Sequence, residues 1–145
     1  MVPDHNINSV ITAVAFDYGL TTIGCAVGQS LTKSASTLTA IRARDGVPID
    51  WQDIGQILAE WQPDVCIVGL PLNMDGSHSE MCQRAEKFAR RIDGRFGIKV
   101  ATMDERLSSF EARGEIIEKT GSRDFKKQNI DSLSAQLILQ SWFNQ

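Results

Sequence analysis

The sequence predicts an α/β domain built on a five-stranded mixed sheet flanked by helices. Three strand-like runs come first, separated by turns too short for a crossover, which indicates antiparallel neighbours. Two further apolar runs are each preceded by an amphipathic helical pattern, which indicates parallel strands joined by right-handed crossovers. With 145 residues, 42% of them hydrophobic, the chain is long enough to bury the core of one such domain.

The first half of the chain supplies the antiparallel strands. A polar tail at residues 1–9 precedes the single domain, which is predicted to span residues 10–145. Strands are predicted at Val10–Phe16, at Ile23–Val27 and near Ser36–Arg42. The break Asp45-Gly46-Val47-Pro48 then ends this part of the sheet.

The second half alternates helices and strands. Spacings of three, four and three residues between Trp51, Ile54, Leu58 and Trp61 predict a helix that ends at Pro63, with both tryptophans packing in the core. The later elements are a strand at 65–68, a helix around 81–92, a strand at 98–101, and helices at 109–119 and 130–143. The pattern contains no repeats, no low-complexity segment and no second domain.

Charge is distributed unevenly along the chain. The net charge of −3 argues against nonspecific affinity for nucleic acid, yet residues 84–99 contain six basic and only two acidic side chains. On the predicted helix, Arg84, Lys87, Arg91 and Arg95 form one stripe beside the apolar face. Contact with phosphates and a solvated flank are both open for this stripe.

The composition predicts a cytoplasmic protein with no membrane partner. No apolar run approaches the ~20 residues needed to cross a bilayer. Residues 1–9 lack the basic-then-apolar pattern of a signal peptide. The cysteines Cys25, Cys66 and Cys82 have no metal-ligand spacing and are expected to be reduced thiols.

Three acidic residues stand at the ends of predicted elements. Asp17 closes a buried strand, Glu105 follows the last strand, and Asp131 opens the last helix. Burying a carboxylate costs several kcal/mol unless it is paired or ligated. Carboxylates suit Mg²⁺ or Mn²⁺, and two such ions about 3.5–4 Å apart can drive phosphodiester hydrolysis. The two histidines, His5 and His78, lie in segments that are predicted to be exposed, so a nucleophilic triad is poorly supported.

Each acid also has a simpler interpretation. Asp17 can be a turn residue that caps local amides. Asp104 and Glu105 can stabilise a following helix through its dipole, and Asp131 can be a helix cap. The combination of the acids, rather than any one of them, favours a metal site.

Five short blocks of the sequence carry a family resemblance. They are residues 15–19 (AFDYG), 23–28 (IGCAVG), 68–76 (VGLPLNMDG), 104–108 (DERLS) and 131–135 (DSLSA). Together they resemble the YqgF (RuvX-type) family of ribonuclease H-like nucleases, described as pre-16S rRNA nucleases and earlier as Holliday junction resolvases. The resemblance extends over about residues 12–143 and agrees with the predicted strand order.

The resemblance implies specific roles. The metal-binding acids would be Asp17, Glu105 and Asp131, with Asp104 as a neighbouring partner. The protein would be a bacterial cytoplasmic enzyme that trims the 5′ end of precursor 16S ribosomal RNA, using a pair of Mg²⁺ or Mn²⁺ ions. The chain departs from the family at Thr22, where members often carry a basic residue, so a phosphate contact there is in doubt.

Several further residues are candidates for substrate binding. Asn73, in the glycine-bounded loop 69–76, offers both a donor and an acceptor for substrate contact, and a rigid turn containing proline is the alternative for that loop. Arg106 can hold a phosphate or pair with Asp104. The last three candidates form a basic group ahead of Asp131: Arg123, Lys126 and Lys127.

Other function classes stay open at this level. The runner-up is a resolvase of four-way DNA junctions, which would most naturally act as a symmetric dimer. Asp17-Tyr18-Gly19-Leu20-Thr21 also resembles the phosphate-binding turn of actin-like kinases, but that architecture needs two lobes. A non-catalytic RNA-binding module is the third alternative. The sequence does not decide between a monomer and a homodimer.

Overall fold

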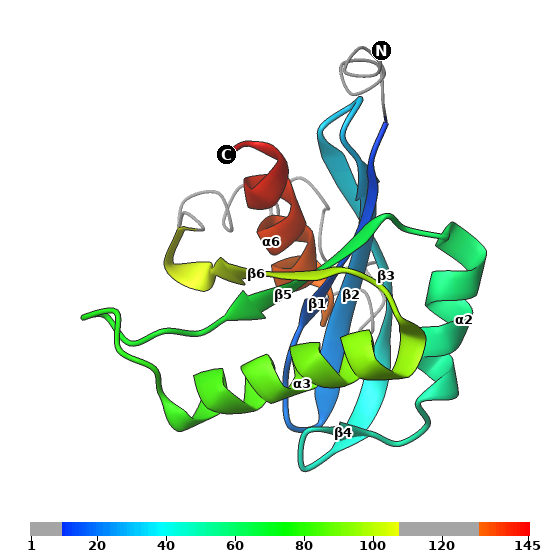
Figure 1. Cartoon of the computed structure of the whole chain (residues 1–145). Coiled ribbons are helices and arrows are strands. Elements are labelled where there is room, and N and C mark those ends of the chain that lie inside the picture. Colours follow the sequence, from blue (N-terminus) through cyan, green and yellow to red (C-terminus); the bar gives the residue numbers. More distant parts are fainter. Residues whose placement is uncertain (1–9, 108–130) are drawn as a thin grey trace, which may run out of the picture.

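The protein is described here by a computed structural model that places residues 10–107 and 131–145. One sheet with the strand order β4-β3-β2-β1-β5-β6 forms its centre (Figure 1). The strands are β1 (Thr12–Asp17), β2 (Thr22–Gln29), β3 (Ser34–Arg44), β4 (Val47–Pro48), β5 (Val65–Leu70) and β6 (Val100–Asp104). β1 pairs antiparallel with β2 and parallel with β5, which confirms the predicted mixed sheet.

The prediction of five strands was wrong, because the sheet has a sixth strand at its edge. Asp45 and Gly46 have φ values of 50° and 81°, and the two-residue turn they form pairs Arg44 with Val47. Positive φ at both turn residues is typical of a type I′ hairpin. Pro48 is tolerated because an edge strand needs no donor on its outer side. A strand of two residues leaves no alternation in the sequence by which to predict it.

Helices cover both faces of the sheet. α2 (Gln52–Trp61) and α3 (Glu80–Phe96) pack on one face, and α6 (Leu133–Phe143) packs on the other (Figure 1). Side chains of β1 alternate between the two layers, as a strand with both faces buried requires: Val14 and Phe16 face α3, whereas Ala13 and Ala15 face α6. The predicted helix at 109–119 lies outside the described residues.

The core confirms some of the packing predictions and corrects one. Trp51 packs on the ring of Phe88, with the ring centroids 6.1 Å apart. Trp61 is 39% exposed at the end of α2, so its assignment to the core was wrong.

The cysteines and the helix lengths bear on two expectations, reduced thiols and no membrane-spanning helix. Cys25, Cys66 and Cys82 are all buried and free. Burial raises the pKa of the Cys66 thiol to about 12 and also raises that of Cys25. Within the described ranges, no helix combines the length and the hydropathy that crossing a bilayer requires.

Candidate active site at one edge of the sheet

Asp17 lies at the end of β1 with its side chain on the α6 face of the sheet. It continues the alternation of Ala13 and Ala15, which face α6, and it is partly buried. Its neighbour on β2 is Gly24, the residue paired with it in register. Its neighbour on β5 is Gly69, because Phe16 pairs with Val68 and the next residue of each strand follows in parallel. A glycine therefore flanks Asp17 on each side.

The glycine on β2 makes room for Asp131. A Cβ at Gly24 would lie 2.5 Å from the carbonyl oxygen of Asp131 and 3.1 Å from the Cα of Ser132. Only the missing side chain lets this segment lie directly on the strand beside Asp17. Asp131 is exposed and occupies a turn, and α6 begins at Leu133 rather than at Ile130 as predicted.

The glycine on β5 makes room for Glu105 in the same way. A Cβ at Gly69 would lie 2.9 Å from both Cγ and Oε2 of Glu105, and 2.6 Å from Cδ1 of Ile138 on α6. Glu105 begins a short 3₁₀ helix directly after β6. Its carboxylate therefore lies over β5 on the α6 face, at the same edge as Asp17.

Asp17, Glu105 and Asp131 thus come from three separate segments to one face and one edge of the sheet. Their donor set is all carboxylate oxygen, which fits Mg²⁺ or Mn²⁺. Among the described residues they are not a group whose ligand atoms all lie within 4.8 Å of one another. Ligands shared between two ions about 3.5–4 Å apart need not be that close, because each ion contacts only some of them.

Ser132 holds the start of α6 against the sheet by hydrogen-bonding to two of its strands. β3 has one extra residue opposite Gly24, so the ladder between β2 and β3 is irregular there. The fully buried Ser132 hydroxyl fills this gap: it accepts a hydrogen bond from the Cys25 amide (3.0 Å) and donates one to the Leu38 carbonyl (2.6 Å). The residue after Asp131 is therefore hydrogen-bonded to two strands, which holds Asp131 beside Asp17.

Replacing Ser132 by alanine should destabilise the protein. The Cys25 amide and the Leu38 carbonyl would lose a buried partner, and each such group costs about 1–3 kcal/mol. We expect Ser132→Ala to lower the denaturation midpoint, because β2, β3 and the start of α6 lose both of these hydrogen bonds. The matched control is Ser134→Ala, in the first turn of α6. Equal midpoints for the two variants would contradict this role for Ser132.

Asp104, the neighbouring acid, pairs with Arg106. The Arg106 guanidinium donates to both oxygens of Asp104, with Nη2 2.7 Å from Oδ2 and Nε 3.1 Å from Oδ1. Hydrogen bonds from Arg106 keep the pKa of the Asp104 carboxyl below its usual range. Of the two alternatives for Arg106, the structure shows pairing with Asp104.

The predicted loop 69–76 is held together by its own side chains. The amide of Asn73 donates to the Ser77 hydroxyl (3.0 Å), and Asp75 accepts from the amide and the hydroxyl of Ser77. Arg106 ties this loop to the end of β6 by donating to the Met74 carbonyl (3.0 Å). The loop thus lies at the same edge as Asp17, but Asn73 is engaged within it. The other three substrate-binding candidates, Arg123, Lys126 and Lys127, lie outside the described residues.

A second group of ligand-type side chains lies at the start of α3. Nδ1 of His78 is 3.4 Å from a carboxylate oxygen of Glu86 and 3.6 Å from Sγ of Cys82. The candidate ligand atoms of these three residues all lie within 4.8 Å of one another. The group mixes nitrogen, sulfur and oxygen donors, so the metal ions that it prefers differ from those that the carboxylates at the end of β1 prefer.

The residues that sequence analysis missed are the ones that bring the acids together. Gly24, Gly69 and Ser132 carry no chemistry of their own, but they allow or hold the approach of Asp131 and Glu105. The available signal was a glycine inside an apolar strand pattern, which often marks a close approach of another segment.

A mixed sheet of this strand order, with helices on both faces, defines the ribonuclease H-like class of α/β fold. The same fold is seen in RuvC from Thermus thermophilus, solved in complex with a Holliday junction substrate, with a TM-score of 0.54 and 13% identity over 92% of this chain and 95% of that one. The yeast mitochondrial Holliday junction resolvase Ydc2 also matches, with a TM-score of 0.51 and 10% identity over 90% of this chain and 77% of that one. The chain belongs to the RuvX family, described as Holliday junction resolvase, whose model matches residues 11–145.

Relatives within the family carry a different description. A protein of Actinobacillus succinogenes named "Putative pre-16S rRNA nuclease" is 55% identical over 93% of this chain and 96% of its own length. A protein of Haemophilus ducreyi with the same name is 56% identical over 92% of this chain and 96% of its own length. The resemblance to the YqgF (RuvX-type) family is therefore confirmed.

Proposed function

We propose that the protein is a metal-dependent nuclease that hydrolyses phosphodiester bonds during maturation of the 5′ end of precursor 16S rRNA in the cytoplasm. The observation that carries this proposal is the approach of Asp17, Glu105 and Asp131 to one face of one sheet edge, through Gly24 and Gly69. The names of the relatives support precursor rRNA as the substrate.

The three carboxylates would hold a pair of Mg²⁺ or Mn²⁺ ions. When bound, such ions supply an activated water and stabilisation of the leaving oxygen. The chain contributes the positions of the ligands: Asp17 is fixed by pairing on both sides of β1, and Glu105 by the end of β6. Ser132 holds Asp131 through its two hydrogen bonds.

Substrate contacts are proposed around this edge. Asn73 lies in the loop 69–76 beside Asp17, and Arg106 lies in the short 3₁₀ helix after β6, where it pairs with Asp104. Arg123, Lys126 and Lys127 precede Asp131 in the sequence and would supply positive charge to the RNA backbone.

Resolution of four-way DNA junctions is the second candidate. The description of the matching family model favours it, as does the likeness of the fold to RuvC. The same three acids would serve either reaction, because both hydrolyse a phosphodiester bond. The two candidates differ in the substrate that the surrounding surface accepts.

The metal requirement and the substrate can be tested together. We expect the purified protein to cleave a precursor 16S rRNA fragment with Mg²⁺ or Mn²⁺, to lose this activity in EDTA, and to regain it when either ion is returned. A synthetic four-way DNA junction is supplied in parallel at the same concentration. Cleavage of the junction alone would favour the resolvase, and cleavage that survives EDTA would overturn the metal site.

A further inference from the structure

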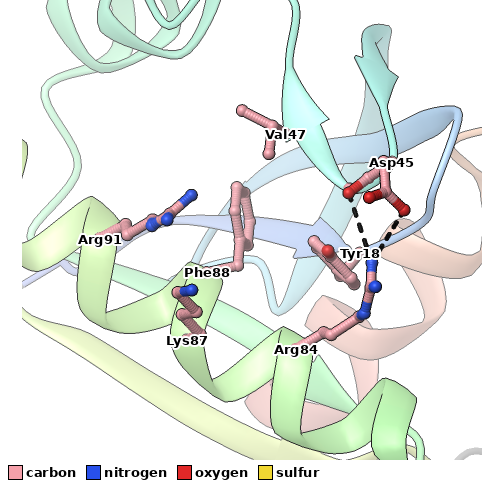
Figure 2. A pocket seen from close by; sticks show the side chains of 8 residues that line it. Tyr18, Asp45, Val47, Arg84, Lys87, Phe88 and Arg91 are labelled. Carbon is pink, nitrogen blue, oxygen red and sulfur yellow. Dashed lines mark hydrogen bonds and ion pairs between the residues drawn. The ribbon is translucent and has the colours of Figure 1, made fainter.

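A cavity of about 260 Å³, called the basic pocket below, lies beside the end of β1, on the face of the sheet opposite the candidate acids. It opens between α3 and the β3–β4 hairpin (Figure 2). Its lining includes Tyr18, Asp45, Arg84, Lys87, Phe88 and Arg91. The cavity is smaller than the ~300–1,000 Å³ that encloses a whole drug-sized ligand. It suits one part of a longer molecule.

The charge of this basic pocket is positive. Arg84, Lys87 and Arg91 lie three and four residues apart on α3, so they share one face of the helix. Arg84 is committed to the hairpin, since Nη1 donates to Oδ1 of Asp45 at 3.1 Å and to its carbonyl oxygen at 3.4 Å. Within the described parts of the chain, Lys87 and Arg91 form no ion pair, and both are exposed. Two positive charges thus remain to meet an anionic ligand.

The wall of the pocket is well packed. The ring of Tyr18 lies against the buried ring of Phe88, with the centroids 5.3 Å apart. The Tyr18 hydroxyl lies where a Cβ at Gly46 would be, and Gly46 has φ +81° in the hairpin turn. Asp45, the other turn residue, is bonded to Arg84. The hairpin, the end of β1 and α3 therefore hold one another, and the pocket has a defined shape without a ligand.

The pocket is joined to the candidate active site by one peptide bond. Tyr18 directly follows Asp17, and consecutive Cα atoms are about 3.8 Å apart. Neighbouring residues at the end of a strand direct their side chains to opposite faces. Asp17 therefore faces α6 and the acids, whereas Tyr18 faces α3 and the basic pocket. A polymer that crosses this edge of the sheet would contact both.

We propose that the basic pocket binds the phosphodiester backbone of the substrate strand next to the bond that is cleaved. This inference rests on the proposed nuclease function. Lys87 and Arg91 would contact phosphates, Arg84 and Asp45 would hold the wall, and Tyr18 would separate the pocket from the reacting bond. Contacts of this kind position a nucleic acid without reading its sequence. The basic stripe predicted on this helix is thereby given a role at three of its four members.

The test measures binding rather than cleavage. A single-stranded fragment of precursor 16S rRNA is bound by the protein in an Asp17→Asn background, with and without Lys87→Ala/Arg91→Ala. Each lost phosphate contact on a single strand should reduce the slope of log K against log [salt] by about 0.7, so the double change should reduce it by about 1.4. At about 0.1 M salt, this slope change corresponds to roughly 25-fold weaker binding.

A matched control removes the same charge elsewhere. Arg90→Ala/Lys99→Ala loses two exposed cations that do not line the pocket, and it should keep nearly wild-type affinity. A DNA strand of the same sequence should lose affinity equally, because the contact is to phosphates. Equal weakening by both pairs of changes, or a loss confined to RNA, would overturn the proposal.

The result is independent of the proposed reaction. If the wild-type protein cleaves RNA but Lys87→Ala/Arg91→Ala leaves binding unchanged, the pocket assignment fails and the nuclease proposal stands. If the pair of changes weakens binding but no metal restores cleavage, the nuclease proposal fails alone.

Discussion

Asp17→Asn is expected to abolish metal-dependent cleavage while leaving the fold intact. The amide keeps the shape of the side chain but removes the charge that would hold a divalent cation between β2 and β5. Because metal ions provide several kcal/mol of transition-state stabilisation, we expect kcat to fall at least about 10³-fold, equivalent to about 4 kcal/mol. Single-turnover cleavage of a precursor 16S rRNA fragment measures this loss.

A second measurement separates the loss of a ligand from the loss of the fold. A cation that binds only the folded state raises its melting temperature. We expect Mg²⁺ or Mn²⁺ to raise the melting temperature of the wild-type protein and to have a smaller effect on Asp17→Asn. Asp93→Asn is the matched control, because it removes an exposed carboxylate of α3 on the other face of the sheet. Unchanged cleavage by Asp17→Asn would remove Asp17 from the metal site.

Gly24→Ala should damage both stability and activity. The added Cβ would lie 2.5 Å from the Asp131 carbonyl, and backbone cannot yield as a flexible side-chain end does. Overpacking of this kind costs about 1–3 kcal/mol, and displacing Ser132 would add the cost of a lost buried hydrogen bond, for a total of about 2–4 kcal/mol. Chemical denaturation of the two proteins measures this difference.

The sharpest comparison for this change is another glycine-to-alanine substitution. Gly94 lies within α3, and a Cβ there would meet nothing within 4 Å. We expect Gly94→Ala to stabilise the protein by about 0.5–1 kcal/mol, because alanine favours a helix and reduces the freedom of the unfolded chain. If Gly24→Ala were as stable as the wild type, the close approach of Asp131 to β2 would be wrong.

Much of the architecture could be predicted because it depends on local patterns. The continuous apolar runs of β1 and β5 indicated central strands, and short connections fixed the antiparallel order of the first three. Asp17 stood out because a core strand rarely ends in a carboxylate without a reason. Glu105 and Asp131 were predicted from their places at the ends of elements, and the structure brings both to the edge where Asp17 lies.

The remaining features depend on contacts between distant parts of the chain. That Gly24 and Gly69 make room for Asp131 and Glu105 follows only from the placement of the segments after β6 and before α6. Nothing in the sequence indicated a role for the Ser132 hydroxyl, because its insertion between β2 and β3 depends on a bulge that no periodicity reveals. Arg106 was predicted either to hold a phosphate or to pair with Asp104, and only the geometry shows the pairing.

The hydroxyl that joins β2 to β3 belongs to a residue 107 positions later in the chain than its partner Cys25. A ribosome releases the N-terminal part of a protein first, so both strands exist long before the side chain that links them. Asp131 arrives with that same segment. A growing chain therefore contains Asp17 but neither a finished sheet nor a full set of acids. The last hydrogen bonds between β2 and β3 and the third carboxylate at this edge therefore come from one segment near the C-terminus.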